Sequence, residues 1–423
     1  MIWQRRQAWS GPLRCFAIQR APGAGQKSSA RDLILREYGA KNFQVKFFEV
    51  KVPARINILG NPSDANEGDH QTISAAVNIW AGARVESADK IVFEQVKKSG
   101  HKFVPQSHLE IEPCPEPKIS YGTEFDLLSA ALKTLLKHSP ELREKITGQG
   151  LKISFHTEIP RQSGLGGSTL LAHLCLLSLV YFYKLDRKKH NLYFLAELTQ
   201  RVEEKELGIT CGFADRYVPL FGDIVYIDYR GKVYHKPVNE EPYCTYEKLG
   251  DLVDHPPLVI VFPGIEHNSG DVHKVMRGRY LEERKGHHGE FENGPFMVRQ
   301  MKLIGDTAWK GKIALLESDW NTFGSLMNEN HRLVNEMMEY CGFTEGAGDA
   351  NNTIIRLGLK MGALGAKLTG AGGGGSVFFL SAPGGEEALG GHLQKRLKKL
   401  GFDRAEVWIP SIVRQGAVVL DRW

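Results

Sequence analysis

The chain has 423 residues, of which 42% are hydrophobic and 24% are charged, and its formal net charge is +5 at pH 7. These proportions are those of an ordinary globular protein, and the length predicts two domains rather than a single core. The charge is mild for this size, so it permits an anionic small substrate but does not argue for nucleic-acid binding.

The N-terminal segment, residues 1–44, is basic and has no acidic residue before Asp32. This composition resembles an organelle transit peptide, although a disordered extension or an incorrectly assigned start fits equally well. The six cysteines are scattered without metal-ligand spacing, which favours a reducing compartment. We therefore expect a cytoplasmic protein, with organelle targeting by the basic segment as the alternative.

The first domain, expected over residues 45–239, begins with β-structure. Its opening segment is rich in β-branched and aromatic residues, which favour strands. Alternating apolar residues predict a second strand, and the next apolar segment looks like its hairpin partner. A later segment has apolar residues at helical spacing. The predicted strands cover residues 44–60, 73–85 and 91–96, and the predicted helix covers residues 121–136.

A polar turn at residues 60–64 ends the first predicted strand. Asn61 precedes a proline in this turn, which holds its backbone extended. Arg55 on the strand and Asp64 in the turn are candidates to line a polar site for hydroxyl groups. A solvated loop is the alternative interpretation of this polar segment.

A glycine-rich loop at residues 160–172 follows a predicted strand at 151–155 and opens an apolar run that ends at Tyr183. Backbone N–H groups can converge in such a loop, and the following helix adds unpaired N–H groups and a partial positive charge. Together these features indicate a cradle for an anion, most often a phosphate, although a tight turn that caps a helix is the alternative. The apolar run contains His173 and Ser178 and is short, so it predicts a buried helix rather than a membrane span.

Residues 191–206 have helical periodicity with an apolar stripe on one side. Helical spacing places Glu204 opposite this stripe. Glu204 is therefore either a surface carboxylate or, where a water-filled cleft lies on that side, a metal ligand. A glycine-containing turn at residues 208–216 and a strand at 220–227 are expected next.

Several acidic residues and prolines near residue 240 mark the expected start of the second domain, residues 240–423. A second glycine-rich loop in this domain, residues 365–376, contains the spacing GxGxxG. A strand rather than a helix is expected after it, which excludes a dinucleotide-binding motif. Its small residues still allow a ligand to approach the backbone closely. The other predicted elements are strands at 258–263, 377–380 and 405–420, and helices at 313–338 and 386–400.

Three stretches in this order resemble the GHMP kinase superfamily, which is named for galactokinase, homoserine kinase, mevalonate kinase and phosphomevalonate kinase. They cover residues 53–64, 160–168 and 367–375. Within the superfamily the sequence is most similar to the glucuronokinases, and bacterial heptose kinases share parts of the pattern. The stretches that carry this closer likeness are residues 60–64, 159–165, 204–209, 215–216 and 269–273, followed by Arg277 and Arg279.

The resemblance implies an α+β fold with two domains. The N-terminal domain would be ribosomal-protein-S5-like, and the C-terminal domain would be a ferredoxin-like α/β sandwich. It also implies an enzyme that transfers the γ-phosphate of ATP to a hydroxyl group with the help of Mg²⁺, in a cleft between the domains. The expected partners are ATP and a small sugar or uronic acid, without nucleic acid or membrane, and the expected assembly is a monomer or a homodimer.

The resemblance also implies a role for each matching residue. Ser168 and Glu204 would hold Mg²⁺ together with phosphates and waters. Asp215 would be catalytic, either as general base or by placing the acceptor hydroxyl, and Arg55 would be catalytic by balancing charge beside it. The residues expected to bind ATP are Pro160, Gln162, Gly164, Leu165, Gly166, Gly167, Ser168 and Thr169. The residues expected to bind substrate are Asn61, Asp64, Arg161, Arg216, Thr369, Gly370, Gly372 and Gly373.

The implied function is phosphorylation of a sugar by ATP, and D-glucuronate, giving D-glucuronate 1-phosphate, is the expected substrate. A uronate carries a carboxylate that arginine can bind with two parallel hydrogen bonds. Arginines on a solvated face are the alternative. Rival functions are a kinase for another sugar, such as a heptose phosphate or a galactose- or fucose-like sugar, and a catalytically silent sensor of sugar and ATP. The candidate arginines are Arg161, Arg216, Arg277 and Arg279.

Overall fold

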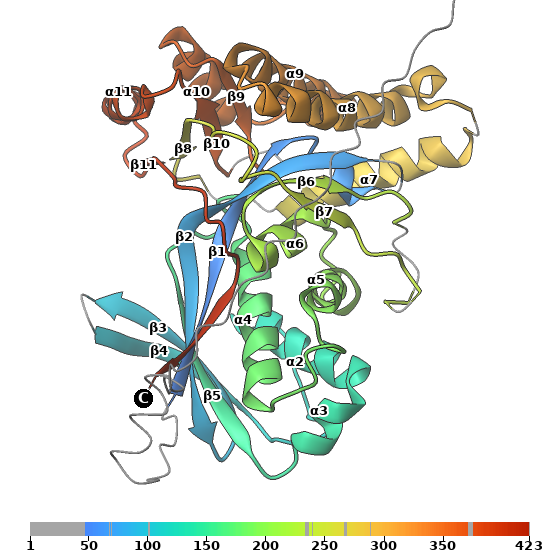
Figure 1. Ribbon diagram of the computed structural model, residues 1–423, viewed down its shortest axis with the longest axis vertical. Coiled ribbons are helices and arrows are strands. Elements are labelled where there is room, and N and C mark those ends of the chain that lie inside the picture. The colour runs from blue at the N-terminus through green and yellow to red at the C-terminus, as the bar shows by residue number, and fades with distance from the viewer. Residues whose placement is uncertain are drawn as a thin grey trace, which may run out of the picture. The chain divides into compact units, whose positions relative to one another are not determined.

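The computed structural model describes residues 47–66, 68, 70–99, 102–232, 237–238, 240–265, 269–287, 289–370 and 375–422. The predictions for residues 1–44 and for Gly372 and Gly373 lie outside these ranges. Two β-sheets with helices packed against them make up the described residues, as Figure 1 shows.

The first sheet consists of β1 (Phe47–Leu59), β2 (Gln71–Ala88), β3 (Ile91–Ser99), β4 (Lys102–Ile111), β5 (Gly150–Thr157), β6 (Ile224–Asp228), β7 (Thr245–Lys248) and β12 (Val418–Arg422). Six of these strands follow the order β12-β1-β2-β5-β3-β4, while β6 pairs with β2 and β7 pairs with β6. The pair β3–β5 is parallel, and the other pairs are antiparallel. The register places small residues of β2 opposite β1, with Ala83 facing Val50 and Ala81 facing Val52.

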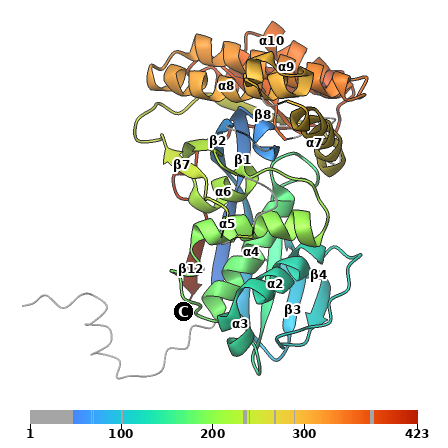
Figure 2. The ribbon, with the colours of Figure 1, turned by 90° about the vertical axis from the view of Figure 1, so that its right-hand side faces the viewer.

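The helices of the first half are α2 (Asp126–His138), α3 (Pro140–Lys145), α4 (Gly167–Phe182), α5 (Leu192–Arg201) and α6 (Ala214–Phe221). Figures 1 and 2 show α2, α4 and α5 on the same side of the first sheet. Because α4 packs between this sheet and its neighbouring helices, it is buried on nearly all sides, as its continuous apolar sequence predicts. Neither α4 nor any other helix in the described ranges has the length and apolarity needed to cross a membrane.

The second sheet consists of β8 (Leu258–Phe262), β9 (Gly365–Leu368), β10 (Val377–Leu380) and β11 (Glu406–Trp408), in the antiparallel order β11-β8-β10-β9. Its helices are α7 (Ser269–Lys285), α8 (Phe296–Leu316), α9 (Trp320–Tyr340), α10 (Asp349–Lys360) and α11 (Glu386–Lys399). The helices α8 and α9 also contact β1, which α4 and α6 contact from the first half. The second half of β1 is therefore buried along its whole length, between the two groups of helices.

Three sequence predictions differ from the observed topology. β3 pairs with β4 and β5 rather than forming a hairpin with β2. Residues 220 and 221 end α6, so the strand predicted from residue 220 begins only at Ile224. Finally, β7 and β12 lie beyond residue 239 yet pair in the first sheet, so the expected domain boundary does not separate the two sheets. The chain crosses to the second sheet and returns at its C-terminal end.

Candidate functional site

Asp215 is the second residue of α6, and residues of β1 hold its carboxylate. Arg55 donates through Nε and Nη2 to the two carboxylate oxygens, and Asn57 Nδ2 donates to Oδ1 at 3.1 Å. Arg55 and Asn57 project to the same face of the strand because side chains alternate along it. The side chain of Arg55 is 3% exposed and that of Asp215 is 21% exposed, so the carboxylate is the open member of the pair. The structure thus brings the two predicted catalytic residues into direct contact.

The charge state of Asp215 depends on this contact. Burial disfavours the charged carboxylate, but Arg55, Arg216 and Asn57 together outweigh burial and hold the pKa of the carboxyl well below its usual range. Asp215 is therefore ionised near neutral pH, and a carboxylate with so low a pKa accepts a proton weakly. Of the two roles that the sequence leaves open, this geometry favours placing the acceptor hydroxyl over early removal of its proton.

The first glycine-rich loop lies against the same arginine. Arg55 Nη1 donates to the carbonyl oxygen of Gly164, and the Arg55 backbone N–H donates to that of Leu165 at 3.4 Å. Gly166 is the N-cap of α4 and has a φ of 86°, a left-handed conformation that glycine adopts freely. None of the described side chains caps this helix. Its first N–H groups therefore remain available to an anion, as the sequence predicts for a phosphate cradle.

The other residues predicted to bind ATP surround this cradle. Thr169, in the first turn of α4, is buried and donates its hydroxyl to Glu203 at 2.7 Å. Ser168, in the same turn, is exposed. The remaining positions lie on the loop or at the start of the helix, and they are Pro160, Gln162 and Gly167. Their roles toward ATP stay predictions.

The second glycine-rich loop packs directly against the first. Ser376 N donates to the carbonyl oxygen of Ser163 at 2.7 Å, and Thr369 Oγ1 lies 3.5 Å from the carbonyl oxygen of Gly164. A Cβ atom on Gly164 would lie 2.7 Å from the carbonyl oxygen of Thr369. A larger residue at Gly164 would therefore push the two loops apart. Thr369 and Gly370, both predicted to bind substrate, lie in this contact between loops.

A small cavity opens beside Asp215. Its volume is about 20 Å³, which holds a water molecule but not a sugar. A sugar could enter only if the cavity walls move. Asn61 and Asp64, two of the predicted substrate-binding residues, line it, and Asn61 Nδ2 donates to the carbonyl oxygen of Gly370 at 3.2 Å. The lining residues are Asn57, Asn61, Pro62, Asp64, Gly212, Asp215, His273 and Gly370.

Asp64 has a second function, because it caps the helix that carries Asp215. Its Oδ2 accepts hydrogen bonds from the backbone N–H groups of Phe213 at 3.0 Å and Ala214 at 2.9 Å, where a negative charge stabilises a helix. Burial, reinforced by the charge of Asp215, raises the pKa of Asp64 to about 6. Asp64 thus helps to orient Asp215 in addition to lining the cavity. Its contact with a substrate hydroxyl stays a prediction.

The predicted Mg²⁺ ligands lie on two elements that touch each other. Glu204 belongs to a π-turn, Val202–Glu206, at the end of α5, and such turns occur often at functional sites. The bond between Thr169 and Glu203 joins this turn to the first turn of α4, where Ser168 lies. A hydroxyl and a carboxylate on adjacent turns are donors that suit Mg²⁺.

The carboxylate of Glu204 is engaged by other side chains in this structure. Arg277 Nη1 donates to it at 2.8 Å, and Gln200 Nε2 also donates to it. The described residues contain no group of three or more His, Cys, Asp or Glu that could hold a metal ion. Mg²⁺ at Ser168 and Glu204 would therefore need phosphate oxygens and waters as its remaining ligands, which is the usual coordination at nucleotide sites.

The structure places Arg216 differently from its prediction as a substrate-binding residue. Its side chain is 2% exposed and donates to Glu203. Its Nη1 lies 3.5 Å from Asp215 Oδ2. Arg216 therefore lies between two carboxylates and does not line the cavity. A buried guanidinium in such a pair is costly to release, so Arg216 is held beside Asp215, and its role in binding substrate stays a prediction.

The other arginines predicted to bind a carboxylate do not line the cavity either. Arg161 is exposed on the first glycine-rich loop. Arg277 is buried and paired with Glu204, as described above. Arg279 is exposed and contacts Tyr340. The structure thus leaves none of these arginines in the wall of the cavity at Asp215.

Two residues of the site were not among the candidate site residues of the sequence analysis. His273 of α7 lines the cavity. Lys367 of β9 is fully buried, and its Nζ donates to Asn61 Oδ1 at 2.7 Å and to the carbonyl oxygen of Asn57 at 3.2 Å. Burial lowers the pKa of Lys367 to about 7. Both residues lie inside stretches that carried the family resemblance, and that was the one signal that could have found them.

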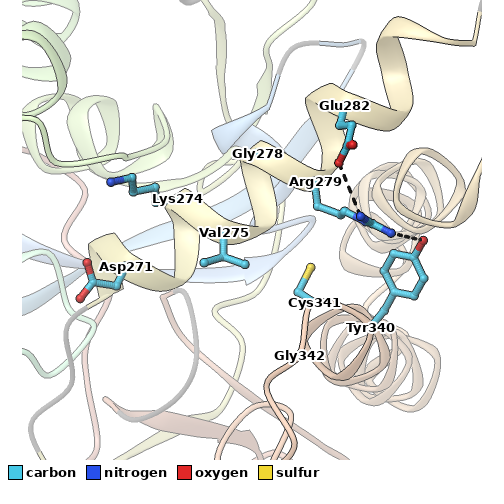
Figure 3. A pocket seen from close by; sticks show the side chains of 9 residues that line it. All are labelled: Asp271, Lys274, Val275, Gly278, Arg279, Glu282, Tyr340, Cys341 and Gly342. Carbon is cyan, nitrogen blue, oxygen red and sulfur yellow. Dashed lines mark hydrogen bonds and ion pairs between the residues drawn. The ribbon is translucent and has the colours of Figure 1, made fainter.

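A wider cavity of about 810 Å³ lies elsewhere, between one side of α7 and the C-terminal end of α9 (Figure 3). Lys274, Val275 and Arg279 line it from α7, and Tyr340 lines it from α9. Of the arginines that the sequence analysis named as candidates for binding a carboxylate, Arg279 lines it. Its greater volume therefore does not make it the candidate active site, since the predicted catalytic and nucleotide-binding residues converge at Asp215.

Comparison with known proteins identifies relatives of both halves of the chain. Residues 126–223 match the profile of the GHMP kinases N-terminal domain, and residues 312–398 match that of the GHMP kinases C-terminal domain. Probable glucuronokinase 2 of Arabidopsis thaliana is 29% identical over 84% of this chain and 89% of the relative. A galactokinase of Thermotoga petrophila is 23% identical over 84% of this chain and 95% of the relative. The crystal structure of Lactococcus lactis galactokinase complexed with galactose has a TM-score of 0.68 at 17% identity, and the match covers 92% of this chain and 98% of that one.

Proposed function

From the premise that this chain belongs to the GHMP kinases, and is a sugar phosphotransferase that uses ATP, we propose that it phosphorylates the anomeric hydroxyl of D-glucuronate. The product would be D-glucuronate 1-phosphate. The observation that carries the proposal is the ion pair between Arg55 and Asp215, which lies beside both glycine-rich loops in a sequence whose relatives include a probable glucuronokinase.

The nucleotide would bind at the start of α4. The unpaired N–H groups of this helix and of the loop before it would contact the triphosphate. Ser168 and Glu204 would hold Mg²⁺, which neutralises charge on the phosphates when it is bound. Glu204 would exchange its bond with Arg277 for this role. The second glycine-rich loop, packed against Gly164, would close the site from the other sheet.

Asp215 would act on the acceptor. Its ionised carboxylate would accept a hydrogen bond from the sugar hydroxyl and orient the oxygen toward the γ-phosphate. Arg55 would limit the basicity of this carboxylate and keep it ionised. The hydroxyl proton would pass to Asp215 only as the new O–P bond forms and the hydroxyl becomes strongly acidic. The bond from the γ-phosphorus to the bridging oxygen would break in the same step, and ADP would leave. In this arrangement, orienting the sugar hydroxyl contributes more to the rate than removing its proton before the reaction begins.

A panel of sugars tests the proposal. ATP consumption would be measured with glucuronate, glucose, galactose, fucose and a heptose phosphate, and we expect the highest kcat/KM for glucuronate. The phosphorus signal of the product should couple to the anomeric proton, which locates the phosphate on that hydroxyl. Transfer to galactose in preference to glucuronate would support the rival function that the Thermotoga relative represents. Binding of both ligands without transfer would indicate a silent sensor.

A further inference from the structure

Two sides of the helix α7 have different surroundings. Figure 3 shows Lys274, Val275 and Arg279 along the side that faces the wider cavity. His273 and Arg277, one helical turn apart, lie on another side. His273 lines the small cavity at Asp215, and Arg277 is buried against Glu204. The helix therefore brings one side chain, His273, from the second half of the chain to the predicted acceptor site.

A uronic acid differs from a neutral sugar because its carboxylate must also be bound in this cavity. Its carboxylate must leave water, and it needs hydrogen-bond donors or a cation to offset that cost. Two of the lining side chains, Asp64 and Asp215, are acids that would repel it, and two others, Asn57 and Asn61, are neutral amides. Because these amides already donate to Asp215 and to the carbonyl oxygen of Gly370, a basic group in the remaining part of the wall would be the best partner for the carboxylate.

The expected arginines do not provide this group, because none of the four lines the cavity. Among the described residues that do line it, His273 is the one with a basic side chain. We propose that His273 binds the carboxylate of the sugar and thereby sets a preference for uronic acids over neutral sugars. This inference rests on the proposed function, since it concerns the specificity of the same site.

The surroundings of His273 suit a ligand that brings its own negative charge. Burial lowers the pKa of His273 to about 4; Asp215 opposes this shift, while Arg216, Arg55 and Arg277 add to it. The imidazole is therefore neutral before the substrate binds, and a neutral imidazole still has one N–H group to donate. A carboxylate placed against the ring would favour its protonation and strengthen the hydrogen bond. A neutral sugar would gain no such charge-assisted bond.

Substitution of His273 tests the proposal. We expect His273→Ala to raise the KM for glucuronate roughly 10- to 100-fold, as for loss of a charge-assisted hydrogen bond, and to leave the KM for ATP nearly unchanged. The KM for glucose should change little, so the preference for the uronic acid should fall by the same factor. Binding of glucuronate without nucleotide, measured by calorimetry, should weaken in parallel. His273→Lys should restore part of the preference, because it returns a cation to the wall.

Lys274→Ala is the matched control, because Lys274 is the next residue on α7 and faces the wider cavity. It should leave both KM values unchanged. An unchanged preference in a folded His273→Ala variant, in an enzyme that phosphorylates glucuronate, would overturn the role of His273 alone. A wild-type enzyme that rejects glucuronate would overturn the proposed function and this inference together. The wild-type measurement therefore separates the two failures.

Discussion

Two clusters of buried charge pack against α6, and they contain the same number of charges of each sign. The site cluster joins the predicted catalytic pair to two further residues, and the anchor cluster includes two residues from the C-terminal half of α5. The site cluster is formed by Arg55, Asp215, Arg216 and Glu203. The anchor cluster is formed by Glu197, Arg201, Lys232 and Glu241.

The clusters differ in their access to ligand. In the anchor cluster, every side chain is at most 7% exposed. Lys232 Nζ lies 2.5 Å from Glu197 Oε1 and 3.2 Å from Glu241 Oε1, so one buried cation of the cluster pairs with both of its acids. In the site cluster, Asp215 is 21% exposed and lines a cavity. A balanced set of buried charges is therefore not by itself a sign of function.

The two clusters are connected through α6 itself. Arg216 belongs to the site cluster, and its neighbour Tyr217 donates a hydrogen bond from its hydroxyl to Glu197 of the anchor cluster. The anchor cluster thus fixes the helix, while the site cluster uses the fixed helix to present Asp215 to the cavity. We expect substitutions in the anchor cluster to change stability and substitutions in the site cluster to change turnover as well.

The largest expected effect comes from Asp215→Asn, which keeps the shape of the side chain but removes its charge. Turnover should fall roughly 10²–10⁴-fold, because the variant no longer places the acceptor hydroxyl with a negative charge. Binding of a nonhydrolysable ATP analogue should persist, since the first glycine-rich loop is unchanged. Steady-state kinetics and calorimetry with the analogue would measure both. Near-normal turnover would show that Asp215 takes no part in the mechanism, and the site cluster would then, like the anchor cluster, contribute to stability alone.

A matched pair of substitutions, Glu203→Gln and Glu197→Gln, tests the comparison directly. Each removes one buried acid from its cluster and should cost roughly 3–5 kcal/mol of stability, because a buried cation loses its partner. Only Glu203→Gln should also reduce kcat, since Glu203 joins Thr169 of the nucleotide loop to Arg216 beside Asp215. Urea unfolding would measure the loss of stability. The fall in kcat would be measured separately, with turnover divided by the concentration of protein that binds nucleotide. An equal loss of turnover in both variants would contradict the view that the anchor cluster affects stability alone while the site cluster also affects turnover.

Local sequence patterns predicted much of this arrangement. The strand, glycine-rich loop and helix from residues 150 to 182 follow one another along the chain, so glycine spacing and an apolar run were enough to predict them. The family resemblance also placed Arg55, Asp215 and the two loops in one predicted site, and the structure brings them into contact. These predictions succeeded because each depended on neighbouring residues or on the order of motifs.

The errors concern contacts between distant parts of the chain. α6 contains Pro219 and the strand-favouring Tyr217 and Val218, so its local sequence did not predict a helix. Its N-terminus is capped by Asp64, which lies about 150 residues earlier. The pairing of Arg216 with Glu203 was likewise not predicted, because sequence alone could not show that these two residues meet. Such pairings depend on tertiary structure, which local patterns do not encode.

The smallest of the three expected effects comes from Asp64→Asn. Asp64 is not a member of the site cluster, but it adjoins that cluster, which contains two acids of its own. The pKa of Asp64 rises from 3.8 to about 6 on folding. A raised pKa in the folded state means that the ionised form carries a cost, which is absent below about pH 4, grows between pH 4 and 6, and is complete above pH 6. The cost at neutral pH is roughly 3 kcal/mol.

Asparagine keeps an oxygen for the N–H groups of Phe213 and Ala214, so the cap of α6 should survive in this variant. The difference in unfolding free energy between Asp64→Asn and the wild-type protein should therefore shift in favour of the variant as the pH rises from 4 to 7. Urea unfolding at several pH values would measure it. Parallel stability curves would show that Asp64 ionises without cost, and the two clusters would then differ only in the exposure of Asp215.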